Sequence, residues 1–196
     1  MAPAEAPRAS RPRVVFLGDS LTAGLGVSPA EAYPALLQRR MHDAGLDYEV
    51  VNAGVSGDTS AGALRRVDWS LGDDARVLVV AIGANDGLRG LPARALEQNL
   101  EAIVDAAARK HVAVLIAGME APPNFGEAYT RDFRTVYREV ARSRHVRFLP
   151  FLLDGVAGLP ALNQADGIHP NAEGHRLVAD LVWRELEPML TARPSS

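Results

Sequence analysis

The segment at residues 18–24 carries the first side chain whose type and position fit catalysis. It reads Gly-Asp-Ser-Leu-Thr-Ala-Gly, follows a short apolar run, and presents Ser20 in a tight turn. A serine hydroxyl at such a point can attack a carbonyl carbon once a base removes its proton. Serine also commonly caps a helix or turn, with flanking glycines serving backbone geometry, so this segment by itself leaves both interpretations open.

A base and a carboxylate occur together near the end of the chain, at residues 166–171. There Asp166 precedes His169 by three residues, and Pro170 restricts the backbone after the histidine. Hydrolysis by a serine needs an imidazole to take the hydroxyl proton and a carboxylate to orient that imidazole. The spacing lets one loop supply both groups. His175 could join His169 and Asp166 around a divalent cation, but convergence from a helix six residues away is awkward and no further ligand cluster is evident.

Two further segments carry groups that can stabilise an oxyanion. Gly57 stands in residues 52–59, where a glycine before a predicted helix lets a backbone N–H approach a ligand closely. Asn85 stands in residues 83–90, where a side-chain amide can donate to developing negative charge. An ordinary turn and helix cap explains the first segment equally well, and an Asx-turn explains the second. Asp86 is either a catalytic residue or, more in keeping with its neighbours, a brace of its own loop.

All four segments are expected at the same edge of one sheet. Five apolar runs predict strands buried on both faces, because the runs are nearly continuous rather than alternating; they cover residues 14–17, 48–51, 77–82, 112–117 and 146–149. Helical periodicity separates them, at residues 33–44, 59–71, 96–107, 129–140 and 172–186. This alternation predicts an α/β fold with a mostly parallel five-stranded sheet between two helical layers. Ligands of such sheets bind beyond the carboxyl ends of the strands, where each of the four segments begins.

Composition limits the classes of function. The chain has 196 residues, of which 47% are hydrophobic and 23% charged, so one globular domain is expected. A net charge of −3 gives no field that would attract nucleic acid or anionic lipid, and no apolar run reaches membrane-spanning length, so stable membrane insertion is not expected. The absence of cysteine excludes a thiolate nucleophile and leaves the redox compartment undetermined.

The chain ends are expected to lie outside the domain. Residues 1–12 are rich in Ala, Pro and Arg and lack the apolar centre of a signal peptide, so they are interpreted as a flexible leader. Residues 13–190 form the expected domain, and residues 191–196 the tail. This pattern is compatible with a cytoplasmic protein or with one exported after removal of a leader, and it does not predict the oligomeric state.

Taken together, the four segments resemble the SGNH (GDSL) hydrolase family, most closely its thioesterase I, lysophospholipase and arylesterase branch. The motifs are Gly-Asp-Ser-Leu at 18–21, Asn-Ala-x-x-Ser-Gly-Asp-Thr at 52–59, Gly-x-Asn-Asp-Gly-Leu-Arg-Gly at 83–90 and Asp-Gly-Ile-His-Pro-Asn at 166–171. They occur in the family's order, and the resemblance extends from residue 14 to residue 186. One departure is Ala84, which stands where this branch frequently has glycine.

The resemblance implies a three-layer, flavodoxin-like SGNH hydrolase fold and assigns roles to individual residues. Ser20 would be the nucleophile, His169 the general base and acid, and Asp166 the carboxylate that orients the imidazole. The oxyanion hole would comprise the backbone N–H groups of Ser20 and Gly57 and the side-chain amide of Asn85. The implied reaction is hydrolysis of small acyl, aryl or lysophospholipid esters and of acyl thioesters, including acyl-CoA, through an acyl-enzyme, with no metal or organic cofactor.

An acyl groove is expected beside these residues, because apolar side chains occur in the loops at the same edge. We predict that Leu88, Pro122 and Phe125 line it, although packing between loops would explain them as well. Two alternative functions remain at this point. A carbohydrate acetylesterase of the same family would use the same catalytic groups, and a flavodoxin-like module would bind a nucleotide in the same crevice without chemistry.

Overall fold

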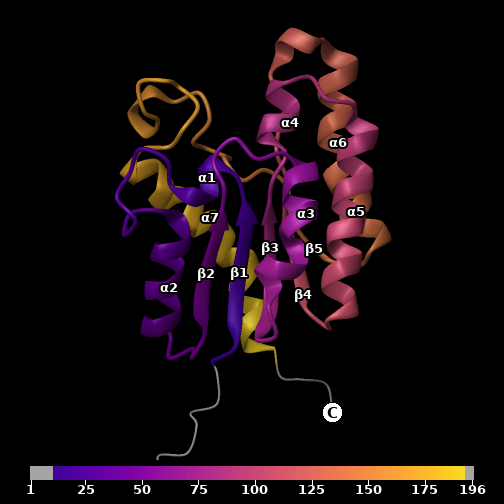
Figure 1. Cartoon of the computed structure of the whole chain (residues 1–196). Helices are drawn as coiled ribbons and strands as arrows, with labels where there is room; N and C mark the ends of the chain where they lie inside the picture. The colour runs from indigo at the N-terminus through magenta and orange to yellow at the C-terminus, as the bar shows by residue number, and fades with distance from the viewer. Residues whose placement is uncertain (1–10, 193–196) are drawn as a thin grey trace, which may run out of the picture.

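A computed structural model describes residues 11–192 and contains one five-stranded, fully parallel sheet (Figure 1). The strands lie in the order β2-β1-β3-β4-β5. Their bounds are β1 (Arg13–Gly18), β2 (Glu49–Gly54), β3 (Ala75–Ala81), β4 (Ala113–Ala117) and β5 (Arg147–Leu149). All five predicted strands are confirmed, and the order is the flavodoxin-like one, in which the chain reverses direction across the sheet between β1 and β3.

Helices cover both faces of the sheet, which confirms the predicted three layers. One layer holds α2 (Tyr33–Asp43) and α7 (Ala172–Thr191), which pack against each other, and the other holds α3 (Ser60–Leu71), α5 (Ala93–Arg109) and α6 (Glu127–Ser143). The remaining helical elements are short and follow strand ends: α1 (Ser20–Ala23), α4 (Ala84–Leu88), η1 (Pro123–Phe125) and η2 (Pro160–Leu162).

The three inner strands carry the core, as their continuous apolar runs predict. Every residue from Val14 to Gly18 in β1 is buried, as are the last five residues of β3. The expectation of burial on both faces is wrong for β2, whose six residues are all exposed or half-buried. The reason is that β2 is an outer strand, with a neighbouring strand on one side only, and that Val50 and Val51 are only partly covered by helices.

The register of the sheet brings the strand ends into line. Gly18 at the end of β1 is level with Gly54 at the end of β2 and with Ala81 at the end of β3. The segments that follow these residues therefore leave the sheet at one edge, called here the carboxyl edge. This alignment places the first three sequence motifs at that edge, and the fourth lies in the connection from β5 to α7.

The predicted domain limits fall partly outside the described residues. The leader assigned to residues 1–12 reaches the described part only at Arg11 and Pro12, and there the Pro12 carbonyl accepts a hydrogen bond from the N–H of Glu49 at 3.0 Å. At the other end, α7 continues to Thr191, one residue into the predicted tail, while residues 193–196 lie outside the described range.

Candidate active site

Ser20 is held at the carboxyl edge by the turn that joins β1 to α1. Asp19 caps the helix, because its Oδ1 accepts the N–H of Leu21 at 3.0 Å, and Ser20 is the first helical residue. The N–H groups in the first turn of a helix have no acceptor within the helix, so the Ser20 N–H is available to a ligand. The helix cap that the sequence left open is thus present, but Asp19 provides it and Ser20 does not.

The loop before α7 brings an imidazole to the Ser20 hydroxyl. His169 Nε2 lies 2.9 Å from Ser20 Oγ, although 149 residues separate the two along the chain. On the other side of the ring, His169 Nδ1 lies 2.7 Å from Asp166 Oδ2. A carboxylate can only accept a hydrogen bond, so Nδ1 carries the ring proton and Nε2 is left as the acceptor for the hydroxyl proton.

Asp166 is held in place and kept ionised by its own loop. Its Oδ1 accepts the backbone N–H groups of Ile168 at 3.0 Å and His169 at 3.1 Å. Hydrogen bonds from the backbone and ring of His169, together with that from Ile168, lower the pKa of the Asp166 carboxyl to about 2. The side chain remains 45% exposed, so these local bonds, and not burial, fix its position.

A second carboxylate lies under the nucleophile in a different environment. Asp19 is 1% exposed, and burial raises the pKa of its carboxyl to about 6 despite the hydrogen bond from Leu21. Its Oδ2 has no hydrogen-bond partner among residues 11–192. The charge of the ionised Asp19 interacts favourably with a protonated His169 ring.

The segment with Gly57 and the segment with Asn85 lie against each other at the same edge. Asn85 Nδ2 donates to the Asp58 carbonyl at 2.9 Å, which uses one of its two N–H groups. Gly57 has φ +80°, in the left-handed region that favours glycine, while the space around its Cα is open. Both residues line the same cavity as Ser20 and His169. The four groups that the sequence singled out are therefore brought together.

Arg66 of α3 connects two strand-end segments, the end of β1 and residues 52–59. Its guanidinium donates to the carbonyls of Gly18 at 2.9 Å and Ala53 at 2.6 Å, and to Asp58 Oδ2 at 2.8 Å. Arg66 and Asp58 are both largely buried, with side chains 19% and 13% exposed. Asp58 Oδ1 also packs directly against Gly62 of α3, so a side chain at position 62 would clash with the carboxylate. Sequence reasoning missed Arg66, whose only signal was its place on the inner side of a predicted helix.

Asp86 is the brace of its loop and does not contact the serine or histidine that the sequence singled out. Its carboxylate accepts the backbone N–H of Ser60 at 2.8 Å and the Ser60 hydroxyl at 2.5 Å. Asn99 Nδ2 donates to the same hydroxyl at 2.8 Å. This buried chain of polar groups fixes α4, which carries Asn85, against the start of α3, which follows Gly57.

A largely apolar cavity of about 500 Å³ opens beside Ser20, within the size range of small-molecule sites. Of the three residues predicted for an acyl groove, Leu88 and Pro122 line it. Phe125 does not, because its ring packs edge-on against Tyr129 with ring centres 5.4 Å apart and lies close to Gly90. The sequence did not single out the rest of the apolar lining, which includes Leu21, Leu25, Met119, Ala121, Phe151, Leu153, Ala157 and Ile168.

His175 has a structural role that the sequence did not predict. It is 1% exposed, its Nδ1 accepts the Tyr33 N–H at 3.3 Å, and its ring stacks on that of Tyr33. Burial lowers the pKa of the imidazole to about 4, so the ring is neutral near pH 7. Within residues 11–192, no group of three or more His, Cys, Asp or Glu residues is arranged to hold a metal ion.

The chain is similar to known ester hydrolases along most of its length. A family model described as the GDSL-like lipase/acylhydrolase family matches residues 16–177. Esterase TesA of Pseudomonas aeruginosa is 41% identical over 93% of this chain and 92% of its own. The thioesterase 1/protease 1/lysophospholipase L1 of Escherichia coli K12 is 35% identical over 90% of this chain and 84% of its own.

A solved esterase structure is similar to this chain in both fold and sequence. The psychrotrophic esterase EstA from Pseudoalteromonas, in a structure inhibited by monoethylphosphonate, superposes with a TM-score of 0.86 at 30% identity. The similarity covers 92% of this chain and 99% of that one.

Proposed function

The chain belongs to the GDSL-like lipase/acylhydrolase family and is an ester and thioester hydrolase, and we propose that Ser20, His169 and Asp166 carry out the reaction. One observation supports this assignment above all others. A continuous hydrogen-bonded path runs from Ser20 Oγ through the His169 ring to Asp166, and it lies at the wall of an apolar cavity.

The first half of the reaction transfers the acyl group to the serine. Ser20 Oγ forms a bond to the carbonyl carbon while its proton passes to His169 Nε2. The tetrahedral intermediate collapses as the bond to the leaving oxygen or sulfur breaks, and His169 returns the proton to that atom. The product alcohol or thiol leaves, and the acyl group remains on Ser20.

Water completes the cycle by the same route. His169 Nε2 takes a proton from water, whose oxygen bonds to the acyl carbon, and the proton then returns to Ser20 Oγ as the ester bond breaks. Asp166 stays ionised throughout, because its pKa is lowered to about 2, and it stabilises the imidazolium that forms in each half-reaction.

Negative charge on the carbonyl oxygen is met by three donors in our assignment. These donors are the backbone N–H groups of Ser20 and Gly57 and the second N–H of Asn85, and the assignment is supported by the place of all three residues in the cavity lining. Donors that are fixed before the reaction stabilise the transition state more than the ground state. The clamp formed by Arg66 and Asp58 and the Asp86 brace supply this rigidity.

The cavity supports an acyl chain as the part of the substrate that is recognised. Its walls are formed mainly by leucine, methionine, proline, alanine and phenylalanine side chains, whereas a sugar would need a denser set of hydrogen-bonding groups. We therefore infer esters and thioesters with an apolar acyl group, lysophospholipids among them, as substrates in preference to acetylated carbohydrates or nucleotides.

Replacement of Ser20 by alanine tests the proposal. Ser20→Ala should lower kcat for a p-nitrophenyl ester at least about 10⁴-fold, while the circular dichroism spectrum and Tm stay close to those of the parent. Ser56→Ala is the matched control, since Ser56 lines the same cavity and has no role in the mechanism, and it should retain activity. Turnover by Ser20→Ala close to that of the parent would refute the assignment.

A further inference from the structure

Exposed large apolar side chains gather at the carboxyl edge of the sheet. Seven such side chains are exposed among residues 11–192, and only Trp69, on α3, does not follow a strand end. The other six, called here the apolar rim, are Leu25, Val55, Leu88, Phe125, Leu159 and Ile168. Their exposed fractions lie between 42% and 49%.

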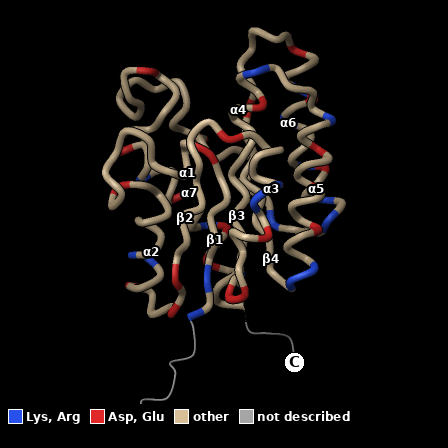
Figure 2. The backbone as a smooth tube through the Cα atoms, in the orientation of Figure 1, with Lys and Arg blue, Asp and Glu red and all other residues tan. Residues whose placement is uncertain are grey.

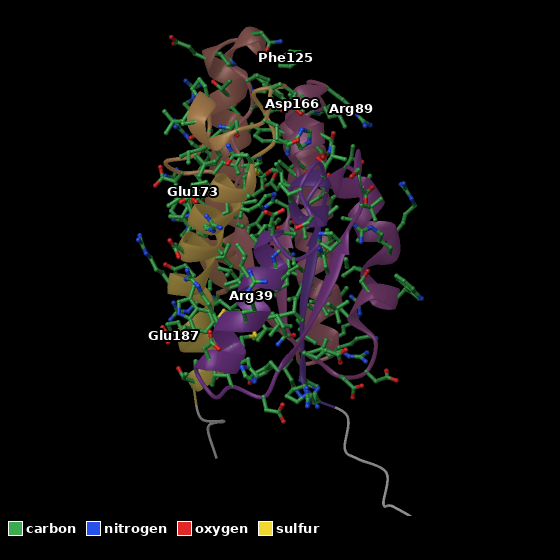
Figure 3. All side chains as sticks on the ribbon, turned by 90° about the vertical axis from the view of Figure 1, so that its left-hand side faces the viewer. Arg39, Arg89, Phe125, Asp166, Glu173 and Glu187 are labelled. Atoms are coloured by element: carbon green, nitrogen blue, oxygen red, sulfur yellow. The ribbon has the colours of Figure 1, made fainter. Side chains whose placement is uncertain are left out.

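Every strand of the sheet contributes to the apolar rim through the segment that follows it. Leu25 follows β1 and α1, and Val55 comes directly after β2. Leu88 ends α4 after β3, and Phe125 ends η1 after β4. The connection from β5 to α7 supplies Leu159 and Ile168. Because the ends of parallel strands meet at one edge, these residues surround one end of the molecule, and Figure 3 shows Phe125 there together with Asp166 and Arg89.

Among residues 11–192, the connections at the opposite edge of the sheet carry none of the large exposed apolar side chains. The connections there carry exposed charged residues, such as Asp43, Asp47 and Lys110. Single exposed apolar residues are ordinary on a soluble protein, but their confinement to one edge is not explained by chance exposure. The rim therefore marks a surface that is suited to leaving water.

Half of the rim has no place in the acyl cavity. Leu25, Leu88 and Ile168 line the cavity and are exposed at its mouth. Val55, Phe125 and Leu159 do not line it, so contact with a bound acyl chain does not account for their exposure. The rim thus combines apolar side chains of the cavity lining with others that lie outside it.

We propose that the apolar rim docks the protein onto the surface of aggregated zwitterionic lipid, from which a single acyl chain enters the cavity. The inference rests on the proposed function, which supplies a substrate whose apolar part lies in such an aggregate. Within residues 11–192, no helix is long and apolar enough to cross a membrane.

Charge argues for zwitterionic rather than anionic lipid. The chain has a net charge of −3, and Figure 2 shows acidic and basic positions interspersed over its elements. At the rim end, Arg89 and Asp166 carry opposite charges. With no field of one sign to attract an anionic surface, docking is driven by apolar contact and is expected to persist at high salt.

Sedimentation with vesicles measures docking without catalysis. The Ser20→Ala protein is mixed with phosphatidylcholine vesicles in 0.5 M NaCl, and the bound fraction gives the partition coefficient. Val55→Ser with Leu159→Ser in the same protein should lower this coefficient about tenfold, because two half-exposed apolar side chains no longer leave water. Trp69→Ser, which removes the most exposed apolar side chain away from the rim, should leave it unchanged.

The kinetic counterpart uses Ser20 intact. The Val55→Ser, Leu159→Ser double variant should keep the parent kcat/KM for soluble p-nitrophenyl acetate and lose about tenfold in rate on micellar lysophosphatidylcholine. Trp69→Ser should match the parent on both substrates.

Three results would overturn the docking proposal while leaving the proposed function intact. In the first, the parent hydrolyses p-nitrophenyl esters but does not bind vesicles. In the second, the double variant and Trp69→Ser lose vesicle binding equally. In the third, sedimentation velocity shows a dimer of the parent that the double variant does not form. The last result would assign the rim to a second copy of the chain. Failure of the proposed function would appear separately, as esterase activity that survives Ser20→Ala.

Discussion

The acid–base half of the proposed active site comes from one exposed loop, whereas the oxyanion half is assembled from three segments joined by a largely buried network. Asp166 and His169 are three residues apart, and their mutual hydrogen bonds close within the loop itself. Gly57 and Asn85 depend on Arg66 and on Asp86, which connect α3, α4 and the ends of β1 and β2.

The difference reflects what each half must do. The His169 ring must keep one tautomer and become positively charged during the reaction. A carboxylate three residues away, Asp166, is sufficient for both. The oxyanion donors must stay fixed while charge develops on a substrate atom that belongs to none of the three segments, and only packing against several elements provides such rigidity. The two halves should consequently respond differently to mutation, the first mainly in activity and the second in both activity and stability.

Loss of Asp166 should produce the largest effect among residues around the nucleophile. We expect Asp166→Ala to lower kcat by about 10³- to 10⁴-fold, because the imidazolium loses its partner and the ring tautomer is no longer fixed. KM and Tm should change little, since the side chain is half-exposed and bonded only within its loop. Steady-state kinetics with a p-nitrophenyl ester and a thermal melt measure these effects. Asp154→Ala, an exposed aspartate in the same connection, is the control and should behave as the parent.

Loss of Asn85 should be less severe for the reaction and more costly for the fold. We expect Asn85→Ala to lower kcat about 10²- to 10³-fold with little change in KM, since the donor acts on the transition state. It should also lower the free energy of unfolding by about 1 kcal/mol, because its bond to the Asp58 carbonyl is lost. Asn124→Ala, exposed at the same edge, should change neither quantity. A change in KM alone would contradict an oxyanion role.

Asp19 caps the helix that begins with Ser20 and also interacts electrostatically with His169. Its replacement should give the smallest kinetic effect. Asparagine can still cap α1 through Oδ1, but it removes the buried charge near His169. We expect Asp19→Asn to slow hydrolysis by roughly two- to tenfold at pH 8 and to raise the free energy of unfolding there by about 3 kcal/mol.

The pH dependence of this stability difference follows from the sign of the shift. The pKa of the Asp19 carboxyl is raised from 3.8 to about 6 on folding, so the folded parent holds its proton more tightly than the unfolded chain does. The parent therefore loses stability as pH rises from about 4 through 6, and Asp19→Asn avoids this loss. Urea unfolding at pH 4 and pH 8 measures it, and an equal difference between the two proteins at both pH values would contradict the burial of an ionised carboxylate.

Much of the fold follows from local patterns in the chain. The strands of residues 13–18 and 75–81 are predicted because their central positions, which are surrounded by other elements, are apolar. The outer strand Glu49–Gly54 breaks the same rule, since its exposed side tolerates Glu49 and Asn52. Whether a strand lies inside the sheet or at its outer side depends on the order of the strands, and no single run of residues encodes that order.

The site divides along the same line. The sequence by itself determined the short-range parts: the turn that presents Ser20, the pairing of Asp166 with His169, and a glycine at 57 that lets a backbone N–H approach a ligand. These depend on backbone geometry over a few residues. The tertiary structure alone decided that Ser20 meets an imidazole 149 residues away, that Arg66 joins α3 to the ends of β1 and β2, and that Phe125 lies outside the cavity. Such contacts depend on how strands align and helices pack, because their energies come from groups brought together only when the whole core forms.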